Sequence, residues 1–472
     1  MQSFKKTPGR FGLFILATSL FFAHSRADIT LTTLTSLSVS TGSTPSAKLT
    51  QAPDGSFYGT AQAGGINNQG TVFRITSDGV FSNLFSFTGT NGKYPGANPA
   101  AGLVSDTKGN FYGTTQSGGA NGLGTIFQFN TNGTFVSLVS FTGTNGAFPG
   151  ANPAGGLTLG TNGQLYGTTQ FGGTNDLENF GDGTVFALNT NGTFTSLISF
   201  SGTNGTFPGA NPTSGLILGT NNLFYGTTYS GGTNDAANYG DGTIFQMNSA
   251  GGFNTLFSFN TTNGANPRAG LTLGTDNNFY GTTYSGGQLM FGTIFKITTA
   301  GKFTLLFSFN NTNGANPYGD LSQSLDGNLY GTTQLGGTNH YGTIFLAGLN
   351  GSLTSLFAFS GTNGDYPAAG LTQGVDGNLY GTTASGTTSP QGTIFRFTPP
   401  PKFLTWYPTN GNFRCIWNSA TGQVYQLQFK TNLSQTTWNN LGGAIVATDS
   451  KTTNSDVIGP NSQRFYRVNL VQ

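Results

Sequence analysis

A tandem repeat occupies most of this chain and constrains its fold more than any other feature. The tripeptide Tyr-Gly-Thr recurs seven times at intervals of 50 to 59 residues, beginning at Tyr58, Tyr112, Tyr166, Tyr225, Tyr280, Tyr330 and Tyr380. A second motif, Gly-Thr-Ile/Val-Phe, follows each copy in the same order, beginning at Gly70, Gly124, Gly183, Gly242, Gly292, Gly342 and Gly392. Such ordered repetition predicts one structural unit that is built seven times.

Each unit contains four strand-like segments. In the sixth unit these are residues 320–325, 328–333, 343–347 and 352–359, which are rich in Leu, Ile, Phe, Tyr and Thr and are bounded by Gly, Asn or Asp. Three residues before each repeat tyrosine stands a Gly or an Asn, as a tight hairpin with positive φ requires. Four short strands in about 50 residues are typical of one blade of a β-propeller.

The two ends of the repeat region complement each other. The seventh unit stops at Pro399 without a fourth strand, whereas residues 29–38 look like a fourth strand that precedes the first unit. We therefore expect an all-β fold in which residues 28–398 form a seven-bladed β-propeller closed by the N-terminal strand, because closure removes exposed sheet edges. An open β-solenoid is the alternative, and it would need no such exchange of strands.

Composition agrees with a folded protein that is rich in turns. The 472 residues include 75 glycines, 13% aromatic residues and 7% charged residues, so long helices and disorder are both disfavoured. Residues 399–401 are three prolines and predict a stiff linker. Beyond them, in residues 402–472, apolar residues alternate with polar ones, as at Phe413, Cys415 and Trp417, which predicts a small β-sandwich. Cys415 is the single cysteine, so no intrachain disulfide can form, and we expect its side chain to be buried.

Residues 1–27 have the pattern of a signal peptide. Basic residues precede an apolar stretch of 12 residues, 11–22, which is too short to span a membrane, and small residues follow at 25 and 27. We expect export to an extracellular, periplasmic or cell-surface location and no transmembrane span. Without this segment the net charge falls from +2 to −2, and no cluster of Lys and Arg indicates nucleic-acid binding.

The repeat resembles a known family. The string Gly-Leu-x-x-x-x-Asp-Gly-Asn-Leu-Tyr-Gly-Thr-Thr, followed by Gly-Gly and Gly-Thr-Ile-Phe, is similar to the GloVer tandem repeat of bacterial cell-surface and secreted proteins. The resemblance covers about 375 residues and implies an exported bacterial protein without enzymatic activity. The tail resembles a fibronectin type III-like sandwich, with Trp417, Tyr425 and residues 464–467 as the matching features.

Groups that could perform acid–base catalysis are scarce after residue 27. His340 is the one histidine there, and as a general base it would need an orienting carboxylate, for which Asp320 and Asp326 are the local candidates. We expect His340 to be an ordinary surface residue. No phosphate-binding loop, zinc-ligand spacing or Ser-His-Asp order is present.

Four loops that join a fourth strand to the next first strand carry an aromatic residue directly before a proline. These candidate ligand-binding residues are Tyr94, Phe148, Phe207 and Tyr366. Aromatic rings beside Asn and Thr suit a carbohydrate or another polar partner, because a ring can cover the apolar face of a sugar. The alternative is that each ring packs locally and pins its long loop to the fold.

Two neighbouring units have longer loops between their second and third strands. Both loops present Asp and Asn oxygens at equal spacing, with Asp176 and Asp182 in one and Asp235 and Asp241 in the other. Ca²⁺ prefers such oxygen ligands, so these residues are candidate calcium ligands, and solvated turns are the alternative. We expect no other cofactor.

These observations predict an exported, non-enzymatic β-propeller that acts as a binding or surface-interaction module. Glycans and envelope proteins are the candidate partners, and nucleic acid is not expected. A carbohydrate-active enzyme of the lyase or glycosidase type and a purely structural envelope component are the alternatives. An enzyme would need carboxylates or histidines that converge in the central cleft, and the first strands offer few of them.

Overall fold

The computed structural model describes residues 29–174, 181–203, 205–234, 240–409, 412–432, 434–457 and 464–471. These residues contain strands and turns and no helix. None of the elements in these ranges is a helix that could cross a membrane. The signal peptide predicted for residues 1–27 lies outside the described residues. Contacts divide the chain into one unit of residues 32–372 and 380–396 and a second that contains residues 29–31, 373–379 and 397–471.

The described part of the repeat region forms seven antiparallel sheets, and each contains a first, second, third and fourth strand in spatial order. The first strands are β2 (Thr50–Gln51), β6 (Val104–Ser105), β10 (Thr158–Leu159), β14 (Ile217–Leu218), β18 (Thr272–Leu273), β23 (Ser322–Gln323) and β27 (Thr372–Gln373). The second strands are β3 (Phe57–Ala61), β7 (Asn110–Thr115), β11 (Leu165–Thr169), β15 (Phe224–Thr228), β19 (Phe279–Thr283), β24 (Leu329–Leu335) and β28 (Leu379–Thr383). The third strands are β4 (Thr71–Ile75), β8 (Thr125–Asn130), β12 (Thr184–Leu188), β16 (Thr243–Met247), β20 (Thr293–Ile297), β25 (Thr343–Ala347) and β29 (Thr393–Thr398).

Six of these sheets end on a fourth strand from their own unit. These are β5 (Phe81–Ser86), β9 (Phe135–Ser140), β13 (Phe194–Ser199), β17 (Phe253–Ser258), β21 (Phe303–Ser308) and β26 (Leu353–Ala358). In the sheet of β27, β28 and β29 that place is taken by β1 (Thr30–Ser36), as the sequence predicted. A short strand, β22 (Ala315–Pro317), adds a further pairing to β24.

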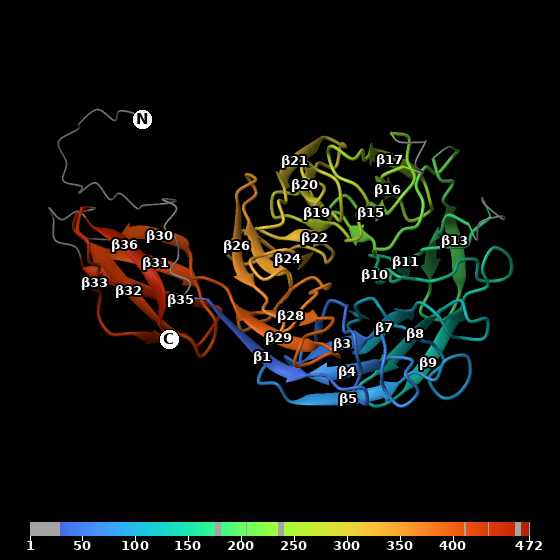
Figure 1. Ribbon diagram of the computed structural model, residues 1–472, viewed down its shortest axis with the longest axis horizontal. Coiled ribbons are helices and arrows are strands. Elements are labelled where there is room, and N and C mark those ends of the chain that lie inside the picture. Colours follow the sequence, from blue (N-terminus) through green and yellow to red (C-terminus); the bar gives the residue numbers. More distant parts are fainter. Residues whose placement is uncertain are drawn as a thin grey trace. The chain divides into compact units, whose positions relative to one another are not determined.

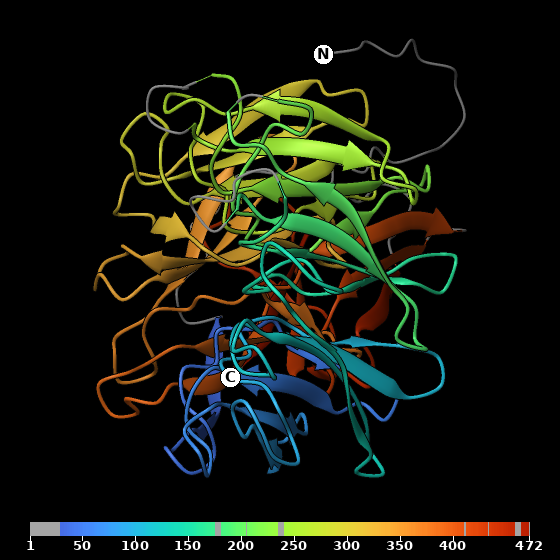
Figure 2. The same cartoon turned by 90° about the vertical axis from the view of Figure 1, so that its right-hand side faces the viewer.

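The sheets of the repeat region are arranged around a common centre, with second strands such as β3 nearer to it than fourth strands such as β5 (Figure 1). In the view of Figure 2 they follow one another in chain order, from blue through green to yellow. The first strands are two residues long, shorter than the six residues predicted for residues 320–325. Asp320, which lies just before β23 in the sixth unit, uses its side chain to contact the fifth unit, because its Oδ1 accepts a hydrogen bond from Gly270 N at 2.6 Å.

The two repeat motifs form one cross-strand pair. In the sixth unit Gly331 of Tyr-Gly-Thr lies opposite Phe345 of Gly-Thr-Ile-Phe. A Cβ atom on Gly331 would lie 2.5 Å from Cζ of Phe345 and 2.8 Å from Cδ2 of Leu321. The ring therefore occupies the space that a side chain would need, and the other six units repeat this arrangement. Glycine stands in this strand to admit an aromatic ring rather than to make a turn.

Most threonines of the motifs use their buried hydroxyl groups in hydrogen bonds within a sheet or to the next unit. The hydroxyl groups of Thr333 and Thr343 lie 2.8 Å apart across the β24–β25 ladder, and equivalent pairs occur in five other units. The preceding threonine bonds the next unit, since Thr332 donates to the carbonyl of Ala369 at 3.0 Å. The same bond recurs from Thr60, Thr114, Thr168 and Thr227.

The seventh unit contacts the first unit in the way that several other units contact their successors. The hydroxyl of Thr372 donates to the carbonyl of Leu49 at 2.6 Å, as Thr272 donates to Leu321 at 2.6 Å. The rings of Tyr380 and Phe57 have centroids 4.0 Å apart, which matches the tyrosine–phenylalanine contacts between other successive units.

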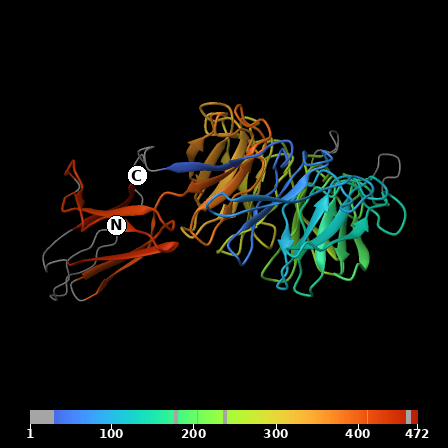
Figure 3. The same ribbon diagram turned by 90° about the horizontal axis from the view of Figure 1, so that it is seen from below.

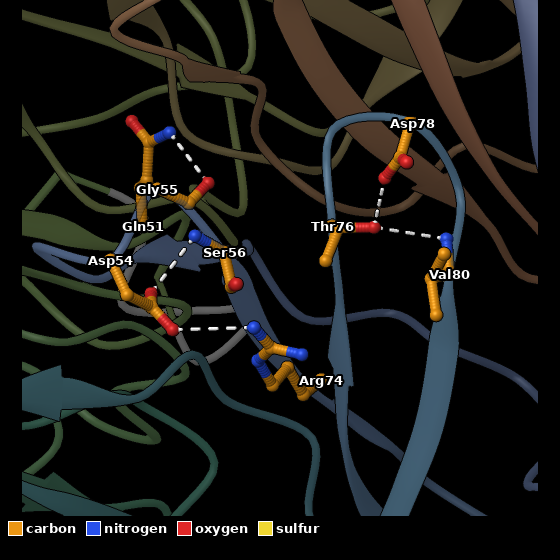
Figure 4. A network of polar contacts seen from close by, with 8 residues as sticks. All are labelled: Gln51, Asp54, Gly55, Ser56, Arg74, Thr76, Asp78 and Val80. Atoms are coloured by element: carbon orange, nitrogen blue, oxygen red, sulfur yellow. Dashed lines mark hydrogen bonds and ion pairs between the residues drawn. The ribbon is translucent and has the colours of Figure 1, made fainter.

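The predicted hairpin turns are confirmed. All seven turn residues three positions before the repeat tyrosines have positive φ, namely Gly55, Gly109, Gly163, Asn222, Asn277, Gly327 and Gly377. In the first unit Asp54 Oδ1 accepts from Ser56 N at 2.9 Å, and Asp54 Oδ2 lies 3.4 Å from Arg74 Nη2 (Figure 4). The next turn is closed by the hydroxyl of Thr76, which bonds Asp78 and accepts from Val80 N at 3.0 Å (Figure 4).

The described tail residues form two sheets that share one apolar core. One sheet contains β30 (Phe403–Thr409), β31 (Asn412–Asn418) and β35 (Lys451–Val457). The other contains β32 (Val424–Lys430), β33 (Asn439–Asn440), β34 (Ile445–Val446) and β36 (Phe465–Val471). The strands of both sheets are drawn in orange to red in Figure 3. Phe413, Cys415 and Trp417 of the first sheet share one core cluster with Tyr425 and Leu427 of the second. Cys415 is fully buried, as the sequence predicted, and burial raises the pKa of its thiol to about 12.

Buried tyrosine–aspartate pairs in the turns predict a loss of stability at high pH. The hydroxyl of Tyr112 donates to Asp106 at 3.1 Å, and Tyr280 and Tyr330 make the same bond to Asp276 and Asp326. Burial, followed by the hydrogen bond to the carboxylate, raises the pKa of Tyr112 from 10.0 to about 12. The pKa values of Tyr280 and Tyr330 are raised as well.

A tyrosine pKa that is higher in the folded state stabilises the fold below pH 10, and this stability is lost as the pH rises through the folded value. We therefore expect the free energy of unfolding to fall between pH 10 and 12. Urea titrations across this range test it, with Tyr112→Phe as the variant that loses its share of the pH dependence. Equal slopes for the variant and the parent protein would contradict the assignment.

Candidate functional site

A cavity lies where the first strands of the repeat region converge. It has a volume of about 480 Å³ and is lined by residues from all seven units, among them Leu49, Leu103, Leu157, Leu216, Leu271 and Thr372. We call this space the central cavity. Leucine, threonine and glycine residues make up most of its lining, because each unit contributes a Gly-Leu or equivalent dipeptide at the start of its first strand.

Two charged side chains line the central cavity in the described structure, Lys48 and Asp320. Both stand at the repeat position that is Gly in the other five units, at 102, 156, 215, 270 and 370. They also line a second pocket of about 430 Å³. The cavity is therefore a hollow with mostly uncharged walls that carries one positive and one negative charge.

An arginine enclosed by tyrosines lies two residues before the cavity lining. The guanidinium carbon of Arg268 is 4.8 Å from the ring centroids of Tyr229 and Tyr284 and 5.2 Å from that of Tyr318. Arg268 and Tyr318 immediately precede Ala269-Gly270 and Gly319-Asp320, which lead into the first strands. We call these four residues the Arg268 cluster. All four side chains are partly exposed, so a ligand can reach them.

The repeat architecture holds the tyrosines in place. Tyr229 and Tyr284 directly follow Tyr-Gly-Thr-Thr, a position occupied by Gln in four other units. The side-chain amide of Asn266 donates to the carbonyl of Tyr229 at 3.1 Å, and that of Asn316 donates to the carbonyl of Tyr284 at 2.9 Å. Each of these asparagines has φ of 55° and belongs to the next unit. The Asn-Pro motif thus fixes the backbone that carries the neighbouring unit's ring.

The Arg268 cluster is positively charged and rich in donors. Nη1 of Arg268 lies 3.4 Å from the hydroxyl of Tyr318, and its buried Nε has no hydrogen-bond partner. No carboxylate in the described residues forms an ion pair with Arg268. Cation–π contacts stabilise a guanidinium over ring faces but leave its in-plane N–H groups available. The cluster can therefore present aromatic surface, hydroxyl groups and a cation to one ligand.

The sequence model of the Gloeobacter/Verrucomicrobia repeat matches residues 17–239 and 233–444. The chain belongs to this repeat family. Together the matched ranges include the whole region in which the Tyr-Gly-Thr motif recurs, so the predicted resemblance of the repeat is confirmed. Among curated proteins, none matches the sequence.

Several solved structures are similar to this Gloeobacter/Verrucomicrobia repeat protein at low identity. The lectin BP39L from Burkholderia pseudomallei is 10% identical, with a TM-score of 0.49 over 80% of this chain and 96% of the lectin. An ulvan lyase, a polysaccharide lyase, is 12% identical, with a TM-score of 0.45 over 75% of this chain and 93% of the lyase. A puromycin hydrolase is 13% identical, with a TM-score of 0.46 over 82% of this chain and 62% of the hydrolase.

In the described structure, none of the four rings predicted from the long loops makes a ring or cation–π contact with the Arg268 cluster. Tyr94 stacks on Phe85 with centroids 4.8 Å apart and also meets the edge of Phe135. Phe148 contacts Phe194 at 5.6 Å, and Phe207 contacts Phe253 at 5.4 Å. Tyr366 is 40% exposed and has φ of 49°. No ring contact in the described residues joins two of the four.

Three of these rings therefore pack against a fourth-strand phenylalanine, which is what the alternative of local loop pins requires. Tyr94 also lines a groove of about 520 Å³ with Ile66, Leu84 and Lys93. Ile66 is 90% exposed, so this groove is open to solvent. A ligand-binding role for the four loop rings stays a prediction.

The candidate calcium ligands are placed in part. Asp176 and Asp235 lie outside the described residues, whereas Asp182 and Asp241 lie within them. Asp182 is 5% exposed, and Oδ2 of Asp241 accepts a hydrogen bond from the hydroxyl of Thr261 at 2.9 Å. The described residues contain no group of three or more His, Cys, Asp or Glu side chains that could hold a metal. Calcium binding by these loops stays a prediction.

His340 is exposed on a turn of the sixth unit and has φ of 63°. Within the described structure it makes no hydrogen bond to either carboxylate that we considered as its partner. Asp320 bonds Gly270 N, and Asp326 accepts from the hydroxyl of Tyr330 at 3.0 Å.

Reasoning from the sequence missed the Arg268 cluster, although a signal was present. Arg268 follows an Asn-Pro dipeptide, and the equivalent residues in most other units are small, at Ser46, Ala100, Ala154, Thr213 and Ala368. Tyr229 and Tyr284 likewise depart from the Gln that most units carry. Aligning the units and asking which facing positions depart from the repeat would have found the cluster.

Proposed function

We propose that this chain is an exported, non-enzymatic β-propeller of seven blades, closed by β1, that binds a carbohydrate beside its central cavity. The place of β1 in the sheet of β27 to β29 supports closure. The Thr372–Leu49 hydrogen bond and the Tyr380–Phe57 ring contact support it as well, because they join the last unit to the first. The seven Tyr-Gly-Thr copies support the blade number.

The Arg268 cluster carries the proposal of binding. Carbohydrate sites combine aromatic faces, which cover the C–H groups of a sugar, with a few fixed polar groups that bond its hydroxyl groups. Three partly exposed tyrosines stand together there, next to a cavity whose wall presents Asp320, Lys48 and several threonines. Tyr229 and Tyr284 directly follow β15 and β19, so two of the rings are held at strand ends rather than on free loop tips, which reduces the entropy lost on binding.

A glycosidase is favoured less by this geometry. Most glycosidases use two carboxyl groups on either side of the scissile bond. The residues that line the central cavity in the described ranges include one carboxylate, Asp320, and its Oδ1 is engaged by Gly270 N. A lyase or glycosidase role and a purely structural role are the outcomes that the experiment below separates from binding.

The remaining assignments rest on the sequence patterns. The leader at residues 1–27 supports export to an extracellular, periplasmic or cell-surface location. The two-sheet tail with Trp417 and Tyr425 in one core supports a fibronectin type III-like sandwich after the prolines of residues 399–401. Envelope proteins are the other class of partner that such a surface module would serve.

A glycan array with the purified protein tests the proposal. We expect saturable binding that Tyr284→Ala and Tyr318→Ala each weaken by ~1–3 kcal/mol, because each substitution removes one ring from the site. Phe207→Ala is the matched control, and it should lower the melting temperature without changing affinity, since its ring packs on Phe253.

Three results would contradict this view. Turnover of the bound glycan would favour the enzymatic alternative, and an array without signal would favour a structural component. Loss of affinity in Phe207→Ala but not in Tyr284→Ala would move the site to the loop rings.

A further inference from the structure

Arg268 differs in its surroundings from the two arginines that form ion pairs in the described structure. Arg74 pairs with Asp54, and Arg464 pairs with Asp456. Arg268 is partly buried and is surrounded by three tyrosine rings, with no carboxylate in ion-pair distance among the described residues. Removing a cation from water is unfavourable unless a counter-charge or hydrogen bonds replace the solvent. The described residues therefore do not supply a carboxylate as the counter-charge of Arg268.

The donors of Arg268 are also incompletely used. The one hydrogen bond of its side chain within the described structure is the 3.4 Å contact from Nη1 to the hydroxyl of Tyr318. Its Nε is buried without a partner. The guanidinium is a planar fork that matches a carboxylate or a sulfate with two parallel hydrogen bonds. An anionic group bonded to the terminal nitrogens would supply the missing counter-charge and use N–H donors of the fork, although the buried Nε would stay out of its reach.

The neighbouring cavity adds to this preference. Lys48 contributes a second cation to the cavity wall, and Oδ1 of the single lining carboxylate, Asp320, already accepts from Gly270 N. Asp241, an acidic residue of the fourth unit, accepts a hydrogen bond from the hydroxyl of Thr261 rather than pairing with Arg268. The rings of Tyr229, Tyr284 and Tyr318 supply the apolar surface that a sugar ring needs.

We infer that the Arg268 cluster recognises an acidic sugar, with the carboxylate or sulfate of a polysaccharide residue bonded to the guanidinium. This inference rests on the proposed carbohydrate-binding function and specifies its ligand class. Nucleic acid is a poorer match, because the chain lacks the clusters of Lys and Arg that follow a phosphate backbone.

The test compares matched acidic and neutral oligosaccharides that share one backbone. The pairs are oligogalacturonate and its methyl ester, and a sulfated galactan oligosaccharide and its desulfated form. We expect the acidic member of at least one pair to bind the purified protein and its neutral partner to bind at least about tenfold more weakly, as loss of a charge-assisted hydrogen bond predicts. The two pairs tell a carboxylate ligand from a sulfate ligand.

Variants then assign the effect to Arg268. Arg268→Gln should weaken binding of the acidic oligosaccharide by about tenfold or more and leave the neutral one unchanged. Arg268→Lys should restore part of the loss, since it keeps the charge but not the fork. Arg74→Gln is the matched control, because it removes an arginine from a surface ion pair and should not change affinity.

Melting temperatures of all three variants show whether each remains folded. If acidic and neutral oligosaccharides bind equally well and Arg268→Gln affects neither, the acidic-sugar inference is wrong while the proposed binding function stands. If no oligosaccharide binds the parent protein, the proposed function fails together with it.

Discussion

Removal of residues 29–38 should unfold the repeat region at a markedly lower temperature rather than fray one end of it. Leu37 of this segment is 5% exposed and packs in one core cluster with Leu49 and Phe57 of the first unit and Tyr380 and Ile394 of the seventh. Leu37 N also donates to the carbonyl of Gly392 at 2.9 Å. The segment thus stabilises two units that are far apart in sequence.

The expected size of the effect is large. Truncating a single buried leucine costs ~2–5 kcal/mol, and the deletion removes Leu37 together with partly buried Leu34 and a whole edge strand. The deletion also leaves β29 as an unpaired edge, which should promote association. Differential scanning calorimetry and light scattering measure both consequences.

Leu37→Ala isolates the contribution of packing, and Thr33→Ala, at an exposed position of β1, is the control that should change little. An unchanged melting temperature and a monodisperse deletion variant would mean that β1 does not close the ring of sheets.

Gly331→Ala should destabilise the sixth unit, although the substitution adds only one methyl group. A Cβ at this position would meet Cζ of Phe345 at 2.5 Å and Cδ2 of Leu321 at 2.8 Å, distances that real Cβ atoms do not adopt. Phe345 is fully buried and Leu321 is 1% exposed, so neither side chain can move into solvent. We expect Gly331→Ala to cost ~1–3 kcal/mol through overpacking.

Removing the ring that faces Gly331 should lower stability more than adding a methyl group to the glycine. Phe345→Ala leaves a cavity beside Gly331, and such truncations cost ~3–5 kcal/mol. The two positions should also couple, so that Gly331→Ala combined with Phe345→Leu loses less stability than the sum of the single variants. Urea unfolding of the four proteins measures the coupling.

Gly443→Ala is the matched control, because a Cβ there meets nothing within 4 Å and its φ is not in the positive range. It should leave stability nearly unchanged. Additive effects of the changes at Gly331 and Phe345 would show that the two motifs do not act as one pair.

Much of the fold could be predicted because its signals are local and recur seven times. Positive φ at the turn residues follows from Gly and Asn at fixed positions, since these residues tolerate it at the lowest cost. Strand boundaries were reproduced for the third strand, β25 at Thr343–Ala347, and within a few residues for β24 and β26. Counting strands in each unit was enough to predict that the strand at residues 30–36 completes the seventh sheet, which lacks a fourth strand of its own.

The sequence was less informative about the candidate site. The loop rings Tyr94, Phe148 and Phe207 were conspicuous because they recur, yet recurrence in a repeat more often reflects packing that every unit needs. Arg268, Lys48 and Asp320 were inconspicuous because each occurs once. Each differs from the residue that most other units carry at the same position. Such a difference points to a site only when the structure shows that several of these residues lie together.

The sequence by itself determined the repeated unit, its four strands, its turns and the strand that is exchanged between the two ends of the repeat region. These features depend on contacts between residues close in the chain, or on motifs repeated often enough to be read by comparison. Only the tertiary structure decided that Tyr229, Arg268, Tyr284 and Tyr318, spread over 90 residues, meet beside one cavity. The physical reason is that this meeting depends on the curvature with which successive sheets pack around a centre, which many weak contacts between units set together and no single motif encodes.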